Sequence, residues 1–133
     1  MFKAECLKTI GKISSFENVA MKQSIGACEK INDLNSGAKI NVIAASVFHV
    51  ENDKTESGEY ECCVFKTIDE NGEISYMSTG SRSAVDSVFD DGDVEELFSE
   101  MPEDMKALVF KIKKQPSKNN QGSFIILLPV DYI

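Results

Sequence analysis

Arg82 is the only arginine of the chain, and it lies in a segment of small and hydroxylated residues, Ser78 to Ala84. The surrounding pattern predicts that a strand ends and a helix begins in this segment. Free N–H groups at a helix start attract anions, and serine hydroxyls add further donors. Ser81 and Arg82 are therefore candidate ligands of a phosphate group. Alternatively, a serine caps the helix and Arg82 pairs with Asp86, four residues on.

Lysines form the second group of candidate ligands. The segment from Lys106 to Lys118 contains five lysines and no acidic residue. Neutralisation of phosphate charge by lysine is a main requirement for binding a nucleic acid without sequence preference. The candidate phosphate ligands among the lysines are Lys66, Lys111, Lys113, Lys114 and Lys118. A solvated surface position is the alternative for each of them.

Aromatic rings on which bases stack are the third requirement, worth about 1 to 3 kcal/mol per base. Tyr76 is the first candidate, because it precedes the hydroxyl-rich segment and its hydroxyl suits a half-wet position. Phe65 follows, because Cys63 and Thr67, which share its face of a strand, are small or polar. The remaining candidate rings are Phe48, Tyr60 and Phe124. A place in the hydrophobic core is the alternative for every one of these rings.

Residues typical of enzymes and metal centres are sparse. The single histidine, His49, has no cysteine at the sequence spacing that is typical of zinc ligands, and the chain contains no C-x-x-C pair. Ser46 lies near His49 in sequence, yet no nucleophile motif frames a serine and no glycine-rich loop suits a phosphate. We therefore expect no enzymatic activity, no cofactor and no metal, with the cysteines as buried free thiols.

Composition suits one domain in the cytoplasm. The chain has 133 residues, of which 42% are hydrophobic, and no apolar run approaches the roughly 18 to 20 residues that span a membrane. Its first residues lack the apolar stretch of a signal peptide. The net charge of −8 opposes nucleic-acid binding, but nine acids and no base lie between Asp86 and Asp104. A basic face can therefore exist elsewhere on the molecule.

The elements that must position these residues are mainly strands. From Lys39 the apolar residues alternate with period two, with a slip near Ala45-Ser46 that indicates a bulge. Asn71-Gly72 predicts a tight hairpin. The expected strands are residues 39–50, 59–68, 73–79, 106–114 and 123–128, and the expected helices run from Ser81 or Ser83 to Phe89 and over residues 94–101.

Residues 1–36 differ from the rest. The segments 5–13 and 17–34 repeat apolar residues every three to four positions, which favours helices. We therefore expect a helical extension at residues 1–36, available for homo-oligomerisation, and a separate barrel domain at residues 37–133.

The order strand, strand, strand, helix, strand, strand favours a mainly β fold with some α content. A long bent first strand, a tight second hairpin and a helix between strands three and four are typical of the OB-fold, a five-stranded Greek-key barrel. A different small barrel or an α+β sandwich would produce similar patterns.

The last 75 or so residues resemble small single-stranded DNA-binding proteins encoded by phages of Gram-positive bacteria. The residues that carry the resemblance form a hairpin before a helix, then a lysine-rich strand, a turn and a final apolar strand: Gly72, Glu73, Tyr76, Thr79, Ser81, Lys111, Lys113, Ser117, Lys118, Asn119 and Phe124. The resemblance implies a role in phage DNA replication or recombination, with single-stranded DNA and proteins of those processes as partners.

A second class of function stays open. Between Asp86 and Asp104 six apolar residues stand among the acids: Val88, Phe89, Val94, Leu97, Phe98 and Met101. This acidic segment could dock a basic partner, so the alternative is a phage protein that binds and inhibits a host protein. A helix pair that covers one end of the barrel would give the same pattern.

Overall fold

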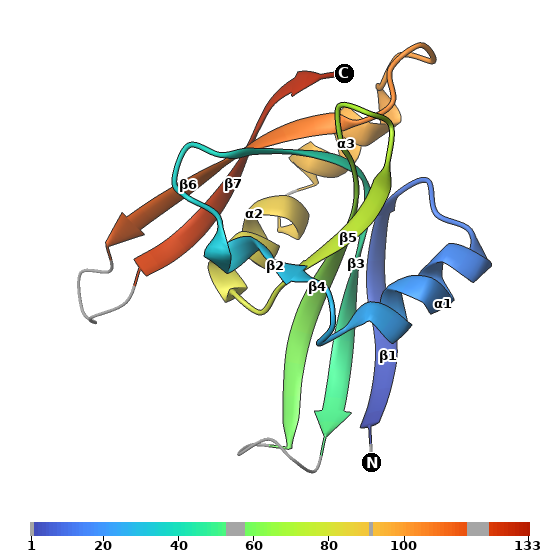
Figure 1. Ribbon diagram of the computed structural model, residues 1–133, viewed down its shortest axis with the longest axis vertical. Coiled ribbons are helices and arrows are strands. Elements are labelled where there is room, and N and C mark those ends of the chain that lie inside the picture. The colour runs from blue at the N-terminus through green and yellow to red at the C-terminus, as the bar shows by residue number, and fades with distance from the viewer. Residues whose placement is uncertain (1, 53–57, 91, 117–122) are drawn as a thin grey trace.

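A computed structural model describes residues 2–52, 58–90, 92–116 and 123–133 (Figure 1). Strands dominate, as expected, and the helices are short. The elements are β1 (Phe2–Gly11), α1 (Ser15–Ser24), β2 (Glu29–Lys30), the 3-10 turn η1 (Ile31–Asp33), β3 (Lys39–Asn52), β4 (Glu59–Ile68), β5 (Ile74–Thr79), α2 (Arg82–Phe89), α3 (Asp93–Ser99), β6 (Leu108–Pro116) and β7 (Ser123–Tyr132).

The described strands form one sheet in the order β2-β5-β4-β3-β6-β7, with β1 also paired to β3. The long strand β3 serves both halves of the sheet: residues 39–42 pair with β6, and residues 44–52 pair with β1 along the same edge. The order β6-β3-β4-β5 is that of a Greek key. The sheet curls but stays open, since β5 and β7 do not pair within the described residues (Figure 1).

Both faces of the sheet bury a hydrophobic core. The expected alternation in β4 is confirmed: Cys63 and Phe65 point to one face, Cys62 and Val64 to the other. The inner core, on the concave side with α2 and α3, contains Ile10, Ile31, Ile40, Val42, Ala45, Val47, Cys63, Phe65, Met77, Ala84, Val85, Val88, Val94, Leu108, Phe110, Ile112, Ile125 and Leu127. The outer core, under α1, contains Met21, Ile25, Phe48, Val50, Cys62 and Val64.

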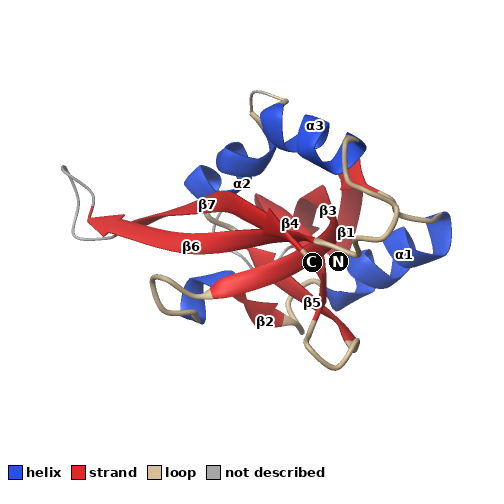
Figure 2. Cartoon of the chain, turned by 90° about the horizontal axis from the view of Figure 1, so that it is seen from above, coloured by secondary structure: helices blue, strands red, loops and turns tan. Residues whose placement is uncertain are grey.

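The helices lie on opposite faces of the sheet. Figure 2 shows α2 and α3 following one another on one side, and α1 apart from them next to β1. Val88 of α2 and Val94 of α3 are buried in the inner core, whereas Met21 of α1 is buried in the outer core. The apolar side of the acidic segment therefore covers the curled sheet, as one of the two interpretations expected. Among the described residues, no helix is long and apolar enough to cross a membrane.

The hairpin between β4 and β5 forms where Asn71-Gly72 predicts it. Gly72 has a positive φ of 83°, and its N–H donates to the Asp69 carbonyl at 3.1 Å. The Asp69 carboxylate accepts from the N–H groups of Asn71 and Glu73 at 2.8 Å each. This turn therefore forms from local contacts alone.

The helical expectation for residues 5–13 was wrong, because residues 5–11 belong to strand β1 and residues 12–13 are in neither a helix nor a strand. The pairing of β1 with β3 shifts between Cys6 and Lys8, so the extra residue Leu7 changes which face the following residues occupy. Cys6 packs against the outer core and Ile10 lies in the inner core. This β-bulge breaks the period of two and leaves a spacing that imitates a helix.

Other boundaries differ in detail. The helix expected over residues 17–34 ends at Ser24, and β2 and η1 replace its second half. The bulge of β3 in its pairing with β4 lies between Val42 and Ala44 rather than at Ala45-Ser46. Strand β7 continues to Tyr132, beyond the expected end at Leu128. Within residues 2–36, strands β1 and β2 pair with β3 and β5, so this part of the chain is not wholly helical.

Candidate nucleic-acid interface

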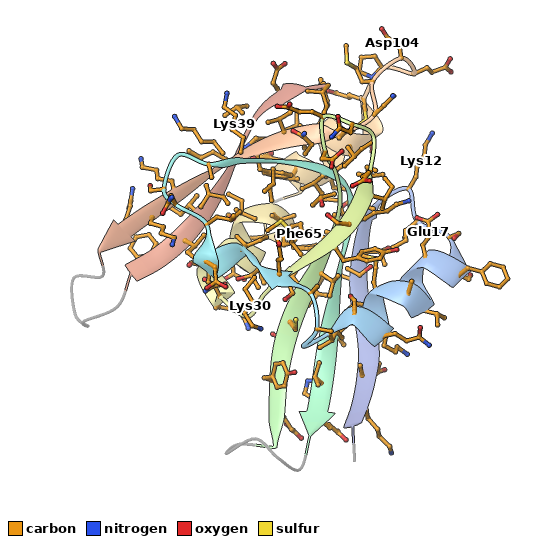
Figure 3. All side chains as sticks on the ribbon, in the orientation of Figure 1. Lys12, Glu17, Lys30, Lys39, Phe65 and Asp104 are labelled. Atoms are coloured by element: carbon orange, nitrogen blue, oxygen red, sulfur yellow. The ribbon has the colours of Figure 1, made fainter. Side chains whose placement is uncertain are left out.

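Three exposed lysines lie together where β3 begins beside β6. Lys39 and Lys111 are direct partners across these antiparallel strands, and Lys113 follows two residues further on the same face. Their neighbours Ile40, Phe110 and Ile112 point the other way, into the inner core. The lysines therefore stand on the outer surface of the curled sheet, where Figure 3 labels Lys39.

Strand β7 adds apolar and aromatic side chains to the same surface. Leu128 lies opposite Lys111 and is 40% exposed, and Ile126 lies opposite Lys113. Phe124, two residues before Ile126, is half-buried and shares its face. We call this surface the β6–β7 face; its residues are Lys39, Lys111, Lys113, Phe124, Ile126 and Leu128.

The charge of the β6–β7 face favours an anion. Like charges directly opposite one another on paired strands are destabilising, and Lys39 and Lys111 have this arrangement. No ion pair joins Lys39, Lys111 or Lys113 to an acid in the part of the chain that the structure describes. Lys114 points elsewhere, since its Nζ donates to the Asn32 carbonyl at 2.8 Å. Lys118 lies outside the described residues.

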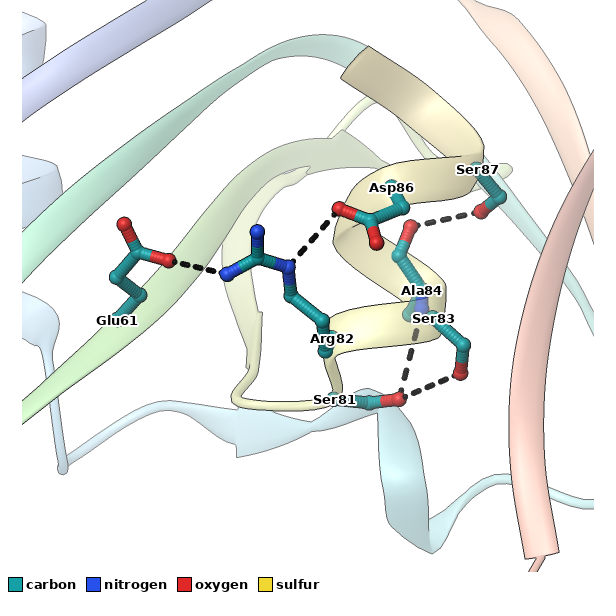
Figure 4. Close-up of polar contacts among 7 residues, drawn as sticks. All are labelled: Glu61, Ser81, Arg82, Ser83, Ala84, Asp86 and Ser87. Carbon is teal, nitrogen blue, oxygen red and sulfur yellow. Dashed lines mark hydrogen bonds and ion pairs between the residues drawn. The ribbon is translucent and has the colours of Figure 1, made fainter. Parts of the chain in front are cut away.

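The surroundings of Arg82 agree with the alternative that the sequence offered. Ser81 caps α2, with its Oγ accepting from the Ala84 N–H at 3.4 Å. The Arg82 guanidinium donates to Glu61 Oε2 at 3.0 Å and to Asp86 Oδ1 at 3.2 Å (Figure 4). Two carboxylates thus already neutralise Arg82, although its side chain is 76% exposed.

The other serines of α2 satisfy the edge of β7. Ser83 Oγ accepts from the Ile125 N–H at 3.1 Å, and Ser87 Oγ accepts from the Leu127 N–H at 3.1 Å. Ser87 in turn donates to the Ala84 carbonyl at 2.7 Å (Figure 4). The hydroxyl-rich segment therefore has a structural task, which is to join α2 to a strand edge.

Lys66 is also already paired. Its ammonium group forms an ion pair with Glu17 of α1, and its side chain is only 16% exposed. The pKa of the Glu17 carboxyl is lowered, mainly by the hydrogen bond from Lys66 and further by its charge and by Ser14. The pair connects the first turn of α1 to β4. Lys66 is therefore a poor candidate for binding a phosphate group.

Two of the proposed stacking rings need correction. Phe48 lies in the outer core and Phe65 in the inner core, and both are completely buried. Neither ring offers a face to a base, because helices cover both sides of the sheet at these positions. Tyr76 and Tyr60 are half-buried beside the outer core, so Tyr76 remains a candidate.

The cysteines are free thiols, two buried and two half-buried. Burial raises the pKa of the Cys62 thiol to about 11, and it raises that of Cys63 well above its ordinary value. Reactive nucleophiles have lowered pKa values, so these two cysteines are core residues. Cys6 and Cys28 are half-buried.

Comparisons with known proteins add no evidence on function, so the function has to be inferred from these residues and this fold. No protein-family model, no curated protein and no solved structure matches the chain.

The sequence did not indicate Lys39 as a candidate ligand, because in the sequence Lys39 is only the first residue of an expected strand. Its pairing with Lys111 joins positions 72 residues apart, and no local signal reports such a distance.

Proposed function

We propose that this chain binds single-stranded DNA without sequence preference, in the host cytoplasm and in phage DNA replication or recombination. The observation that carries the proposal is the β6–β7 face: Lys39, Lys111 and Lys113 are exposed side by side next to the half-buried ring of Phe124. Non-specific binding of single strands combines such a charged surface with rings for stacking.

The topology supports an OB-like interpretation of the fold. The meander β3-β4-β5, the helices α2 and α3, and the return of β6 to pair with residues 39–42 of β3 follow the strand order of a partly open Greek-key barrel. OB-folds bind oligonucleotides over their second and third strands, here β4 and β5. Met21 of α1 and Ile25, which follows the helix, pack on part of that surface, which favours the β6–β7 face instead.

The decisive experiment is a titration of fluorescent oligo(dT) at several salt concentrations. Counterion release gives a log–log slope of about −0.7 per phosphate contact on a single strand, so the three lysines predict a slope of roughly −2. Lys111→Ala and Lys113→Ala should each reduce its magnitude by about 0.7. Lys12→Ala removes an exposed lysine that lies elsewhere (Figure 3) and should change nothing.

The rings are tested in the same assay. Phe124→Ala should weaken binding by about 1 to 3 kcal/mol without changing the salt slope, because it removes a stacked base and no charge. Tyr76→Ala should weaken binding by a similar amount if the DNA also crosses β5, and should leave the affinity unchanged if the DNA lies on the β6–β7 face alone.

Absence of oligo(dT) binding at low salt would refute the proposal and favour an acidic phage protein that inhibits a host protein. In the structure, however, the apolar residues of that acidic segment pack on the inner core.

A further inference from the structure

We propose that His49, Glu51 and Glu59 bind a divalent transition-metal ion such as Zn²⁺. One nitrogen or oxygen atom from each of these side chains lies within 4.8 Å of the atoms from the other two. His49 Nε2 is 3.9 Å from Glu59 Oε2. The three residues are far along the sheet from the β6–β7 face, at the other end of β3.

The backbone brings the three side chains together. His49 and Glu51 are two residues apart on β3 and therefore share a face, the one opposite to Phe48 and Val50. Glu59 is the direct partner of Glu51 across β3 and β4. The ligand positions are thus set by strand pairing, which is a rigid support for a metal site.

The donor atoms suit a transition metal. Zinc binds histidine nitrogen at about 2.0 to 2.1 Å and carboxylate oxygen at about 2.0 to 2.2 Å, so two ligand atoms of a tetrahedral ion lie about 3.4 Å apart. The 3.9 Å between His49 Nε2 and Glu59 Oε2 exceeds this by about 0.5 Å, and no separation within the trio is greater than 4.8 Å, so small side-chain rotations would bring the three atoms to the spacing of a bound ion. An imidazole ligand disfavours Ca²⁺ and Mg²⁺, which prefer oxygen.

Charge in this region also favours a cation. Glu51 and Glu59 are direct partners across β3 and β4, so one ion can bind to both carboxylates. Glu5 and Glu61 flank His49 on the neighbouring strands, and Glu61 is engaged by Arg82. Lys3, the partner of Glu51 on β1, opposes the ion.

Calorimetric titration of the full chain, freed of metal by a chelator, with ZnCl₂ tests the site. We expect one ion per chain, and a loss of affinity of about tenfold or more in both His49→Ala and Glu51→Gln. The matched control is Glu61→Gln, which removes a carboxylate opposite His49 but outside the trio and should keep most of the affinity. Lys3→Ala should tighten binding, because it removes the opposing charge.

Two further measurements separate this site from other causes of binding. Metal-free melting curves of all variants show whether they remain folded. The absorption spectrum with Co²⁺ reports the ligands, since cysteine thiolates give an intense near-ultraviolet charge-transfer band that histidine and carboxylate do not. Weak bands that disappear in His49→Ala support the site. A thiolate band, or zinc affinity that is the same in folded His49→Ala, overturns it.

Discussion

The guanidinium of Arg82 lies between Glu61 and Asp86, so its charge is compensated before any ligand arrives. The same residue shows how one sequence feature supports two interpretations. A cation at a helix start suits a phosphate, but an acid four residues later suits an ion pair equally well. The additional carboxylate of Glu61, on β4, makes the ion pair the dominant arrangement.

We therefore expect Arg82→Ala to leave both the oligo(dT) affinity and its salt slope nearly unchanged. The stability cost should be below about 1 kcal/mol, because exposed ion pairs contribute little. Salt-dependent titration and urea unfolding of the same variant measure the two effects. A slope reduced by about 0.7, as expected for Lys113→Ala, would return Arg82 to the phosphate ligands.

At the scale of elements, the edge of β7 depends on side chains of α2. The N–H groups of Ile125 and Leu127 point to Ser83 and Ser87 rather than to another strand. An unpaired row of N–H groups on an edge strand invites pairing with other chains. The two serines therefore take the place that a closing strand would have in a complete barrel.

Removal of these hydroxyls should be costly. Ser83→Ala and Ser87→Ala each leave a strand N–H without its acceptor, for which we expect a loss of about 1 kcal/mol or more in the free energy of unfolding. Ser99→Ala, which removes an exposed hydroxyl bonded to the Glu95 carbonyl on α3, should cost less than about 0.5 kcal/mol. Equal urea midpoints for all three variants would show that the contacts with β7 contribute nothing.

The end of β1 depends on a close approach between two backbones. Gly11 has a positive φ of 83°, and a Cβ added there would meet the Ile43 carbonyl oxygen at 2.5 Å. Gly26 has a nearly identical φ of 85°, but a Cβ there would meet nothing within 4 Å. Both glycines thus have the left-handed backbone conformation, and they differ in the room that is available for a Cβ atom.

Gly11→Ala should consequently destabilise the protein more than Gly26→Ala. The left-handed conformation costs about 1 to 2 kcal/mol at either position, and the clash at Gly11 adds about 1 to 3 kcal/mol. Thermal and urea unfolding of the two variants give the comparison. If both variants lose the same free energy of unfolding, the clash with the Ile43 carbonyl is relieved without cost and the expected difference is wrong.

At the scale of the whole molecule, residues 2–36 contribute both strands and a helix that contact the rest of the chain. β1 pairs along β3, and Met21 of α1 and the following Ile25 are buried in the outer core. Some apolar surface remains on the outside of α1, where Phe16 is 89% exposed and Val19 is 52% exposed. Homo-oligomerisation through this region stays a prediction.

A chain that begins at residue 37 should lose cooperative unfolding. It would expose Phe48, Val50 and Val64, which are completely buried in the full chain, and would leave a long edge of β3 unpaired. Phe16→Ala changes only an exposed side chain and should melt within about 0.5 kcal/mol of the parent. A truncated chain that melts cooperatively at the parent temperature would restore the two-part organisation expected from the sequence.

The sequence determined the elements whose signals are local. Alternation placed both faces of β4 correctly, Asn71-Gly72 predicted its hairpin with β5, and Ser81, one of the two capping serines that the sequence offered, caps α2. These features depend on strand period, turn geometry and helix capping, which act over a few residues. The mainly β class of the fold followed from them.

Only the tertiary structure decided which residues are available to a ligand. Phe48 and Phe65 point to opposite faces of the sheet, and both are buried because α1 covers one face while α2 and α3 cover the other. Glu17 neutralises Lys66 across 49 positions, whereas Lys39 joins Lys111 across 72. Exposure and charge pairing depend on contacts between distant segments, and local periodicity carries no information about them.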